Sequence, residues 1–190
     1  TGLRTPERIT VIKKLPILSQ AKRSNFLATL VVGVRIRQDG DVRNHNLKCL
    51  LDWIDFFYGD LFDVLLVEQD SAPRLNLDML GAKSYVRKEF IFNPHEYNRG
   101  WGYNVAVRQF CDGTDVVALM DTDVLTGANF VREIIDCHTK YDAISPYQNI
   151  YYTDALEATQ IRQNRRLEKL NNEKKIKNPV TVSGGIMIIR

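Results

Sequence analysis

The chain has 190 residues, a length that fits one domain or little more. Hydrophobic residues make up 44% and charged residues 26%, which is enough apolar material for a core without disulfide or metal staples. The net charge of +3 is too small to predict nucleic-acid binding. The longest apolar stretch, 26–34, is far shorter than the ~20 residues of a membrane-spanning helix. We therefore expect neither a nucleic-acid partner nor a transmembrane segment.

The cysteines point to a reducing compartment. Cys49, Cys111 and Cys137 are widely spaced, form no C-x-x-C pair and are odd in number. This usage is typical of buried thiols rather than of a disulfide framework or a zinc site. We expect a cytoplasmic location.

Residues 1–25 are basic and poorly periodic, so we expect an arm that precedes a single domain of residues 26–190, which we expect to be truncated at its C-terminus because the sequence stops directly after a predicted strand. Within the domain, short apolar and β-branched runs predict buried strands, and apolar residues at helical spacing predict helices between them. The strands are predicted at 28–36, 62–68, 84–92, 115–120, 142–145 and 180–189, and the helices carry Leu47, Leu50, Leu51, Ile54 and Phe57, then Val105, Ala106, Gln109 and Phe110, then Val131, Ile134, Ile135 and His138.

This alternation of strands and helices predicts an α/β fold with a central, mostly parallel sheet flanked by helices, of the Rossmann-like kind. Such sheets bind ligands beyond the carboxyl ends of their strands. The polar residues that follow the predicted strands are therefore the candidate site.

Residues 155–178 differ from the rest because they contain seven Lys or Arg, three Glu and few large apolar residues. We expect a basic helical insert, and two interpretations remain open. The insert is either mobile until a ligand orders it, or a permanently docked helix with Leu156, Ile161, Leu167 and Leu170 on its buried side.

The sharpest signal is Asp121-Thr122-Asp123, which directly follows the apolar run 115–120. Two carboxylates at the end of a buried strand predict a site for a hard divalent cation such as Mn²⁺ or Mg²⁺, which would bridge phosphate oxygens. The simpler interpretation is a polar strand end that caps the next helix.

A second signal is the sequence YNRGWGYNV at 97–105. Its two glycines allow the backbone to approach a ligand, while Asn98 and Arg99 lie at the start of a predicted helix, where anions bind favourably. The alternative is a glycine-rich turn in which Trp101 covers the core.

A third group comprises Arg35 and Arg37 after the first strand and Glu68 and Asp70 after the second. An arginine and an acid at neighbouring strand ends suit a planar nucleobase. A surface ion pair is the competing interpretation.

The fourth group is Ser183-Gly184-Gly185. Paired glycines make room for a ligand such as a sugar ring, although a β-bulge has the same pattern.

In order, the segments VGVRIR, VEQD, YNRGWGYNVAV, LMDTDVL and SGGIMIIR resemble those of GT-A-fold glycosyltransferases. The similarity is closest to the family 2-like members and to the β-1,4-galactosyltransferase and chondroitin polymerase group, which carry F-N-R followed by N-V-G. Here the corresponding residues are Tyr97-Asn98-Arg99 and Asn104-Val105-Ala106.

The resemblance implies a nucleotide-sugar donor, UDP-linked, and a glycan or other hydroxyl acceptor, with transfer by inversion. It implies that Asp123 binds the metal with Asp121, which also borders the sugar or ribose. By the same resemblance, Arg35 with Glu68 or Asp70 borders the base, and Gly184 and Gly185 border the donor sugar.

Two departures from the family pattern leave alternatives open. Members of the family continue past the glycine pair into a segment that supplies the catalytic base, so we expect the base beyond Arg190 and name none. The first strand also lacks the proline common in its place. Alternatives are a nucleotide-sugar-binding domain without turnover and a nucleotidyltransferase, although the latter normally has a glycine-rich loop after the first strand.

Overall fold

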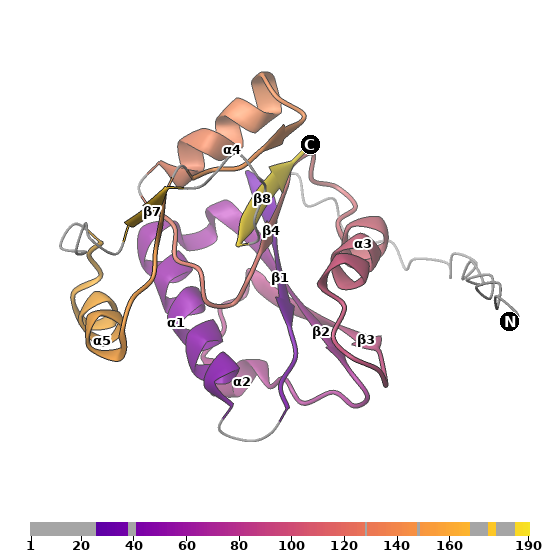
Figure 1. The fold of residues 1–190 in the computed structure, drawn as a ribbon. Coiled ribbons are helices and arrows are strands. Elements are labelled where there is room, and N and C mark those ends of the chain that lie inside the picture. Colours follow the sequence, from indigo (N-terminus) through magenta and orange to yellow (C-terminus); the bar gives the residue numbers. More distant parts are fainter. Residues whose placement is uncertain (1–25, 38–40, 128, 148, 168–174, 178–184) are drawn as a thin grey trace, which may run out of the picture.

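The computed structural model describes residues 26–37, 41–127, 129–147, 149–167, 175–177 and 185–190 (Figure 1). A six-stranded sheet runs in the order β3-β2-β1-β4-β8-β5, and β6 pairs with β7 in a separate two-stranded sheet. The strands are β1 (Ala28–Val34), β2 (Phe62–Asp70), β3 (Val86–Phe92), β4 (Val117–Met120), β5 (Ala143–Ile144), β6 (Asn149–Tyr151), β7 (Lys175–Lys177) and β8 (Ile186–Ile189).

Strands β3, β2, β1 and β4 are mutually parallel, whereas β8 runs antiparallel to both β4 and β5. The predicted fold class, α/β with a mostly parallel central sheet flanked by helices, is thereby confirmed. The helices are α1 (Val42–Phe57), α2 (Leu77–Leu80), α3 (Arg99–Phe110), α4 (Phe130–Thr139) and α5 (Ala155–Asn164), with a 3₁₀ turn, η1, at Gly59–Leu61.

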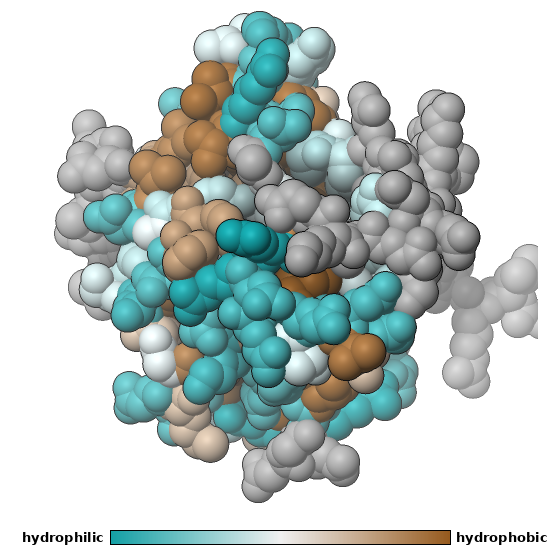
Figure 2. Space-filling view, turned by 90° about the vertical axis from the view of Figure 1, so that its left-hand side faces the viewer, coloured by the Kyte–Doolittle hydropathy of each residue, from teal (hydrophilic) through white to brown (hydrophobic). Residues whose placement is uncertain are grey.

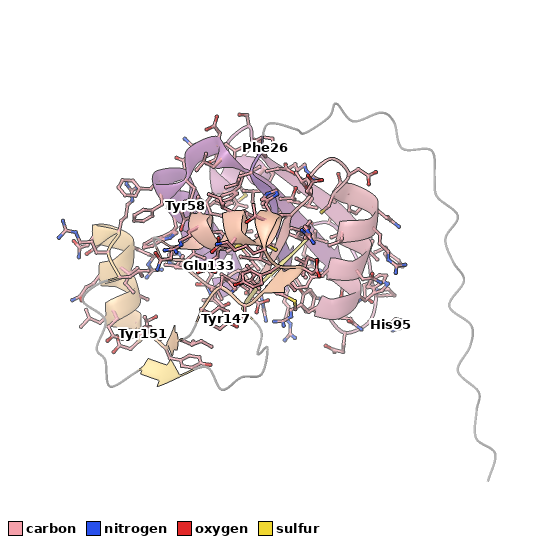
Figure 3. All side chains as sticks on the ribbon, turned by 90° about the horizontal axis from the view of Figure 1, so that it is seen from above. Phe26, Tyr58, His95, Glu133, Tyr147 and Tyr151 are labelled. Atoms are coloured by element: carbon pink, nitrogen blue, oxygen red, sulfur yellow. The ribbon has the colours of Figure 1, made fainter. Side chains whose placement is uncertain are left out.

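Helices cover both faces of the sheet, and β1 shows why. Leu30 and Val32 pack into the larger core, with α1 and α4, whereas Val31 packs into a smaller core beneath α3. Seen from above, α3 accordingly lies on the opposite side of the sheet from α1 (Figure 3). Strands buried on both faces form continuous apolar runs, which is why these segments were recognisable in the sequence.

Some element boundaries differ from the prediction. Strand β3 begins at Val86 rather than at residue 84, and β2 continues to Asp70. In α4 the buried residues include Phe130 and Cys137, whereas the predicted face residue Ile135 is exposed. His138 binds the backbone oxygen of Leu27 through Nε2 at 2.8 Å, consistent with a structural role. The expected arm, 1–25, lies outside the described residues.

The helical part of the predicted insert is α5. A capping box begins it, in which Asp154 accepts from the amide of Glu157, and the left-handed backbone of Arg165 (φ 52°) ends it. Ile161 is buried and Leu167 packs against the larger core, but Leu156 is exposed. Two side chains expected on the buried side of a docked helix thus contact the core, and the expectation for Leu156 is wrong. The choice between a mobile and a docked insert stays a prediction, and Leu170 lies outside the described residues.

Figure 2 shows the face of the molecule that carries α5, and hydrophilic side chains cover most of its lower half. None of the helices in the described parts of the chain combines the length and apolar character needed to cross a membrane.

Candidate functional site

The candidate site lies where the strand order reverses. From β1 the sheet continues to β2 on one side and to β4 on the other, and Val32 of β1 pairs with Met120 of β4. The connections that leave the carboxyl ends of β1 and β4 therefore lead toward opposite edges of the sheet. Open α/β sheets form ligand crevices at such a point. Asp121 and Asp123 follow directly after β4.

Asp121 is held by three residues, two of them in α3. Its amide donates to the backbone oxygen of Gly185, just before β8, at 2.9 Å. Arg99 Nη1 lies 2.7 Å from Asp121 Oδ2, and the hydroxyl of Tyr103 donates to Oδ1 at 3.2 Å. The same hydroxyl hydrogen is shared with the backbone oxygen of Met120, which lies closer, at 2.6 Å. The structure therefore brings the predicted residues Arg99, Asp121 and Gly185 together.

Burial and neighbouring charge perturb this group. Burial raises the pKa of the Asp121 carboxyl, and the charge of Asp123 raises it further, while Arg99 and Tyr103 act in the opposite direction. Burial and the Asp121 charge raise the pKa of Tyr97 to about 12, and the same causes raise the pKa of Tyr103. Both tyrosines are therefore neutral hydrogen-bond donors at physiological pH.

Sequence reasoning missed the two tyrosines. Both lie against Gly33 of β1, where a Cβ would collide with the Tyr97 hydroxyl and lie 3.2 Å from the ring of Tyr103. The signal was present in the sequence, because a glycine within an apolar strand often marks the close approach of another group.

The segment before α3 is fixed by Gln69, a fully buried polar residue of β2. Its side chain accepts from Asn93 Nδ2 at 2.8 Å and from the Asn98 amide at 2.6 Å, and it donates to the Asn98 carbonyl at 2.9 Å. The side chain of Asn98 caps α3 by accepting from the amide of Trp101. The predicted ligand residue Asn98 therefore holds the start of the helix that carries Arg99.

Gly102 makes room for this network, and we predict unequal effects of alanine at the two glycines of α3. A Cβ at Gly102 would lie 2.8 Å from Gln69 Nε2, whereas at Gly100 the nearest atom is 3.8 Å away. Gly102→Ala should lower the free energy of unfolding by about 1–3 kcal/mol through overpacking. Gly100→Ala should be neutral or stabilise by up to about 1 kcal/mol, from helix propensity. Denaturant unfolding measures both, and equal effects would contradict the prediction.

Of the residues predicted to border a nucleobase, Arg35 contacts the segment that precedes α3, whereas Arg37 contacts the start of α1. Arg35 donates to the backbone oxygen of His95, which is labelled beside α3 in Figure 3, and Arg35 Nη2 lies 3.4 Å from Asp70 Oδ1. The predicted ion pair thus forms with Arg35. The backbone amide of Arg37 donates to Asp41, and its carbonyl accepts from Arg74.

Glu68 has a different environment from the other three. It is fully buried, and its Oε1 accepts from the backbone amides of Arg74 and Leu75 at 2.6 and 3.0 Å. Its Oε2 is buried without a hydrogen-bond partner among the described residues. The contacts hold the loop after β2. The base-binding role predicted for Glu68 and for the other residues of its group stays a prediction. Gly184, which was predicted to border the donor sugar, lies outside the described residues.

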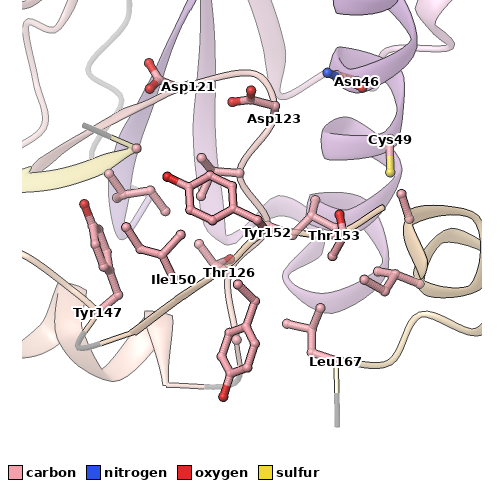
Figure 4. A pocket seen from close by; sticks show the side chains of 18 of the residues that line it. Asn46, Cys49, Asp121, Asp123, Thr126, Tyr147, Ile150, Tyr152, Thr153 and Leu167 are labelled. Atoms are coloured by element: carbon pink, nitrogen blue, oxygen red, sulfur yellow. The ribbon is translucent and has the colours of Figure 1, made fainter. Parts of the chain in front are cut away.

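A pocket of about 820 Å³ opens beside the two aspartates. Asp121 and Asp123 lie together at one side of it, and Cys49 of α1 lies across the cavity from Tyr147 (Figure 4). The segment 121–127, residues 150–155 and the inner side of α5 complete the wall. The cavity thus extends from carboxylates to a region of tyrosine and aliphatic side chains.

Cys49 offers a chemical probe of this pocket. Burial raises the pKa of its thiol, so the reactive thiolate is a smaller fraction at neutral pH than in free cysteine. Alkylation by iodoacetamide should therefore be slow at pH 7 and accelerate about tenfold per pH unit toward pH 9. Cys111 and Cys137 are buried, so a Cys49→Ser variant should label little. Rates that do not change with pH would contradict the expectation.

Asp121 and Asp123 suit a hard cation. Among the residues that the structure describes, no cluster of three or more His, Cys, Asp or Glu has the geometry of a metal site. Mg²⁺ sites commonly use only one or two carboxylates, the remaining oxygens coming from substrate phosphates and water, and Mn²⁺ shares the oxygen preference. The exposed Asp123 and the half-buried Asp121 supply two such oxygen donors.

Comparisons with known proteins give a likeness of fold only. No protein-family model matches the sequence, and no curated protein matches it significantly. One structural neighbour is a protein from Desulfovibrio desulfuricans G20 described as a nucleotide-diphospho-sugar transferase, with a TM-score of 0.41 and 14% identity, covering 62% of this chain. Another is 4-diphosphocytidyl-2C-methyl-D-erythritol synthase from Anaerococcus prevotii DSM 20548, with a TM-score of 0.46 and 10% identity, covering 87%.

The chain spans 57% of the length of the first neighbour and 71% of the second. With such low identities and TM-scores, these likenesses do not assign a function.

Proposed function

We propose that this chain is the donor-binding part of a metal-dependent glycosyltransferase. It would bind a nucleoside-diphosphate sugar, UDP-linked, and serve the transfer of the sugar to a hydroxyl of a glycan or other acceptor. The observation that carries the proposal is the position of Asp121 and Asp123. They follow a central parallel strand at the reversal of strand order, beside Arg99 and a large pocket.

In this proposal Asp123 holds Mn²⁺ or Mg²⁺ together with Asp121. The ion, when bound, would neutralise charge on the departing diphosphate. Arg99 would face the diphosphate, since a guanidinium can donate two parallel hydrogen bonds to phosphate oxygens. The base would lie toward Arg35 and Asp70, and the sugar toward Gly185 and the pocket.

The reaction would proceed with inversion at the sugar carbon C1. The acceptor oxygen forms a bond to C1 from one face while the bond from C1 to the diphosphate oxygen breaks on the other. The acceptor proton passes to a base, which we do not assign to any described residue. The pocket, with its tyrosine and aliphatic walls, is large enough for a sugar ring and part of an acceptor.

Donor hydrolysis tests the proposal. The chain is incubated with a panel of UDP-sugars and Mn²⁺, and the release of UDP is measured, with Asp123→Ala as control. We expect slow UDP release from at least one donor by the wild type only. Binding without release would indicate a domain without turnover. Pyrophosphate release from a nucleoside triphosphate would instead favour nucleotidyl transfer and overturn the proposal.

A further inference from the structure

Both carboxylate oxygens of Asp121 already have protein partners. Arg99 Nη1 lies 2.7 Å from Oδ2, and the Tyr103 hydroxyl donates to Oδ1 at 3.2 Å. A divalent cation needs a carboxylate oxygen and is repelled by a guanidinium in the same place. Arg99 and a cation therefore compete for Asp121.

The two partners of Asp121 differ in how firmly they are held. Tyr103 is buried and anchored to the Met120 carbonyl at 2.6 Å, so it cannot move without disturbing the core beneath α3. The Arg99 side chain is 44% exposed, and that of Asp121 is 29% exposed. The Arg99 guanidinium carbon also lies 6.0 Å from the centroid of the Tyr103 ring. A pair this exposed contributes little stability, so Arg99 can leave at small cost.

A diphosphate is the chemical group best able to draw Arg99 away. It carries more negative charge than one carboxylate and matches the guanidinium fork. Arg99 is also the first residue of α3, a helix of 12 residues whose amino end attracts anions. An Arg99 that turned from Asp121 to a bound diphosphate would exchange one anion for a stronger one and release a carboxylate oxygen.

We infer that Arg99 keeps divalent cations off Asp121 until a nucleoside diphosphate takes the guanidinium, so that cation and nucleotide bind together rather than independently. This rests on the proposed function, and it names Arg99 as the residue that couples the two ligands. The coupling is reciprocal, because a nucleotide that raises the affinity for the cation is itself bound more tightly when the cation is present.

Titrations of Mn²⁺, with and without UDP, test the inference on the full chain by calorimetry or by the electron paramagnetic resonance of free Mn²⁺. For the wild type we expect weak binding of Mn²⁺ alone and binding about tenfold or more tighter with saturating UDP. For Arg99→Gln we expect Mn²⁺ alone to bind about fivefold tighter than in the wild type, and the enhancement by UDP to be smaller than in the wild type by the same factor.

Two further variants serve as controls. Arg108→Gln removes the same charge from an exposed position in the last turn of the same helix, so it should behave as the wild type. Arg99→Lys keeps the positive charge and should still disfavour Mn²⁺ alone. The melting temperatures of all variants show whether each is folded, and the lysine variant tests the inference should the glutamine variant fail to fold.

The inference is overturned if Arg99→Gln binds Mn²⁺ alone no more tightly than Arg108→Gln, or if Arg99→Lys binds it as tightly as Arg99→Gln. Either result leaves the proposed function intact if wild-type UDP binding still requires Mn²⁺ and Asp123. A wild type that binds no UDP in the presence of Mn²⁺ would instead refute the proposed function, and the inference with it.

Discussion

Asp123→Ala is expected to lose the stabilisation that UDP and Mn²⁺ together give to the wild-type chain. Asp123 is the exposed member of the carboxylate pair, and it can bind a cation without first releasing a partner among the described residues. With only one or two carboxylates in such a site, the loss of one removes a large share of the protein's own ligands.

The size of the effect follows from mass action. At ligand concentrations of about 100 times the dissociation constant, binding adds about 2.7 kcal/mol to the free energy of unfolding. For a domain of this size, that corresponds to a rise of about 5–11 °C in melting temperature. We expect such a rise with UDP and Mn²⁺ for the wild type, little with UDP alone, and almost none for Asp123→Ala.

The matched control is Asp112→Ala, which removes an exposed carboxylate from the opposite end of β4. It should shift like the wild type. Asp121→Ala should also weaken the response, because it removes both a potential ligand and the partner of Arg99. Equal melting shifts for the wild type and Asp123→Ala would refute the metal role of Asp123.

The second large effect concerns stability. Arg87→Met should lower the free energy of unfolding by about 3–5 kcal/mol, because it leaves the Asp63 carboxylate charged and buried without its main partner. Arg87 Nε lies 3.1 Å from both carboxylate oxygens and Nη2 lies 2.9 Å from one of them. The side chains are only 16% and 4% exposed, respectively. Nη2 also donates to the Phe110 carbonyl at 2.7 Å, so the pair ties the end of α3 to the sheet.

Chemical denaturation measures this loss against Lys83→Met, whose ion pair with Asp55 is well exposed. The control should change stability by less than about 1 kcal/mol. Adding Asp63→Asn to Arg87→Met should recover part of the loss, because the buried group is then uncharged. A loss for Arg87→Met as small as that of the control would show that Asp63 is not effectively buried.

The fold was predictable where burial on both faces made strands into continuous apolar runs, as in β1 and β2. It was less predictable where a partner far along the chain decides the outcome. Nothing in 180–189 specifies that β8 runs antiparallel to β4, and spacing alone placed Ile135 on the inner face of α4. The strand at 84–92 was recognised with its charged residues, but the burial of Arg87 depends on Asp63 in the neighbouring strand.

The positions of the charged residues of the site could be predicted from the sequence, but the contacts between them could not. The sequence placed Asp121 and Asp123 at a strand end and Arg99 at a helix start, and the structure has them there. It did not indicate that Arg99 binds Asp121, because that contact joins two segments brought together only by the sheet. The tyrosines at 97 and 103 were overlooked because aromatic residues near a glycine-rich turn are usually part of a core.

The antiparallel strand β8 has a consequence for synthesis on the ribosome. It is hydrogen-bonded to β4 along its whole length, and residue 185, just before it, accepts from the Asp121 amide. Until residues 185–189 have emerged, a nascent chain exposes β4 as an unpaired apolar edge, which can pair with other chains. In such a chain the segment around Asp121 also lacks the hydrogen bond from the Asp121 amide to residue 185. Release of chains shortened before residue 185 should therefore yield aggregation-prone products, and the Asp121 segment should reach its final position only after β8 has joined the sheet.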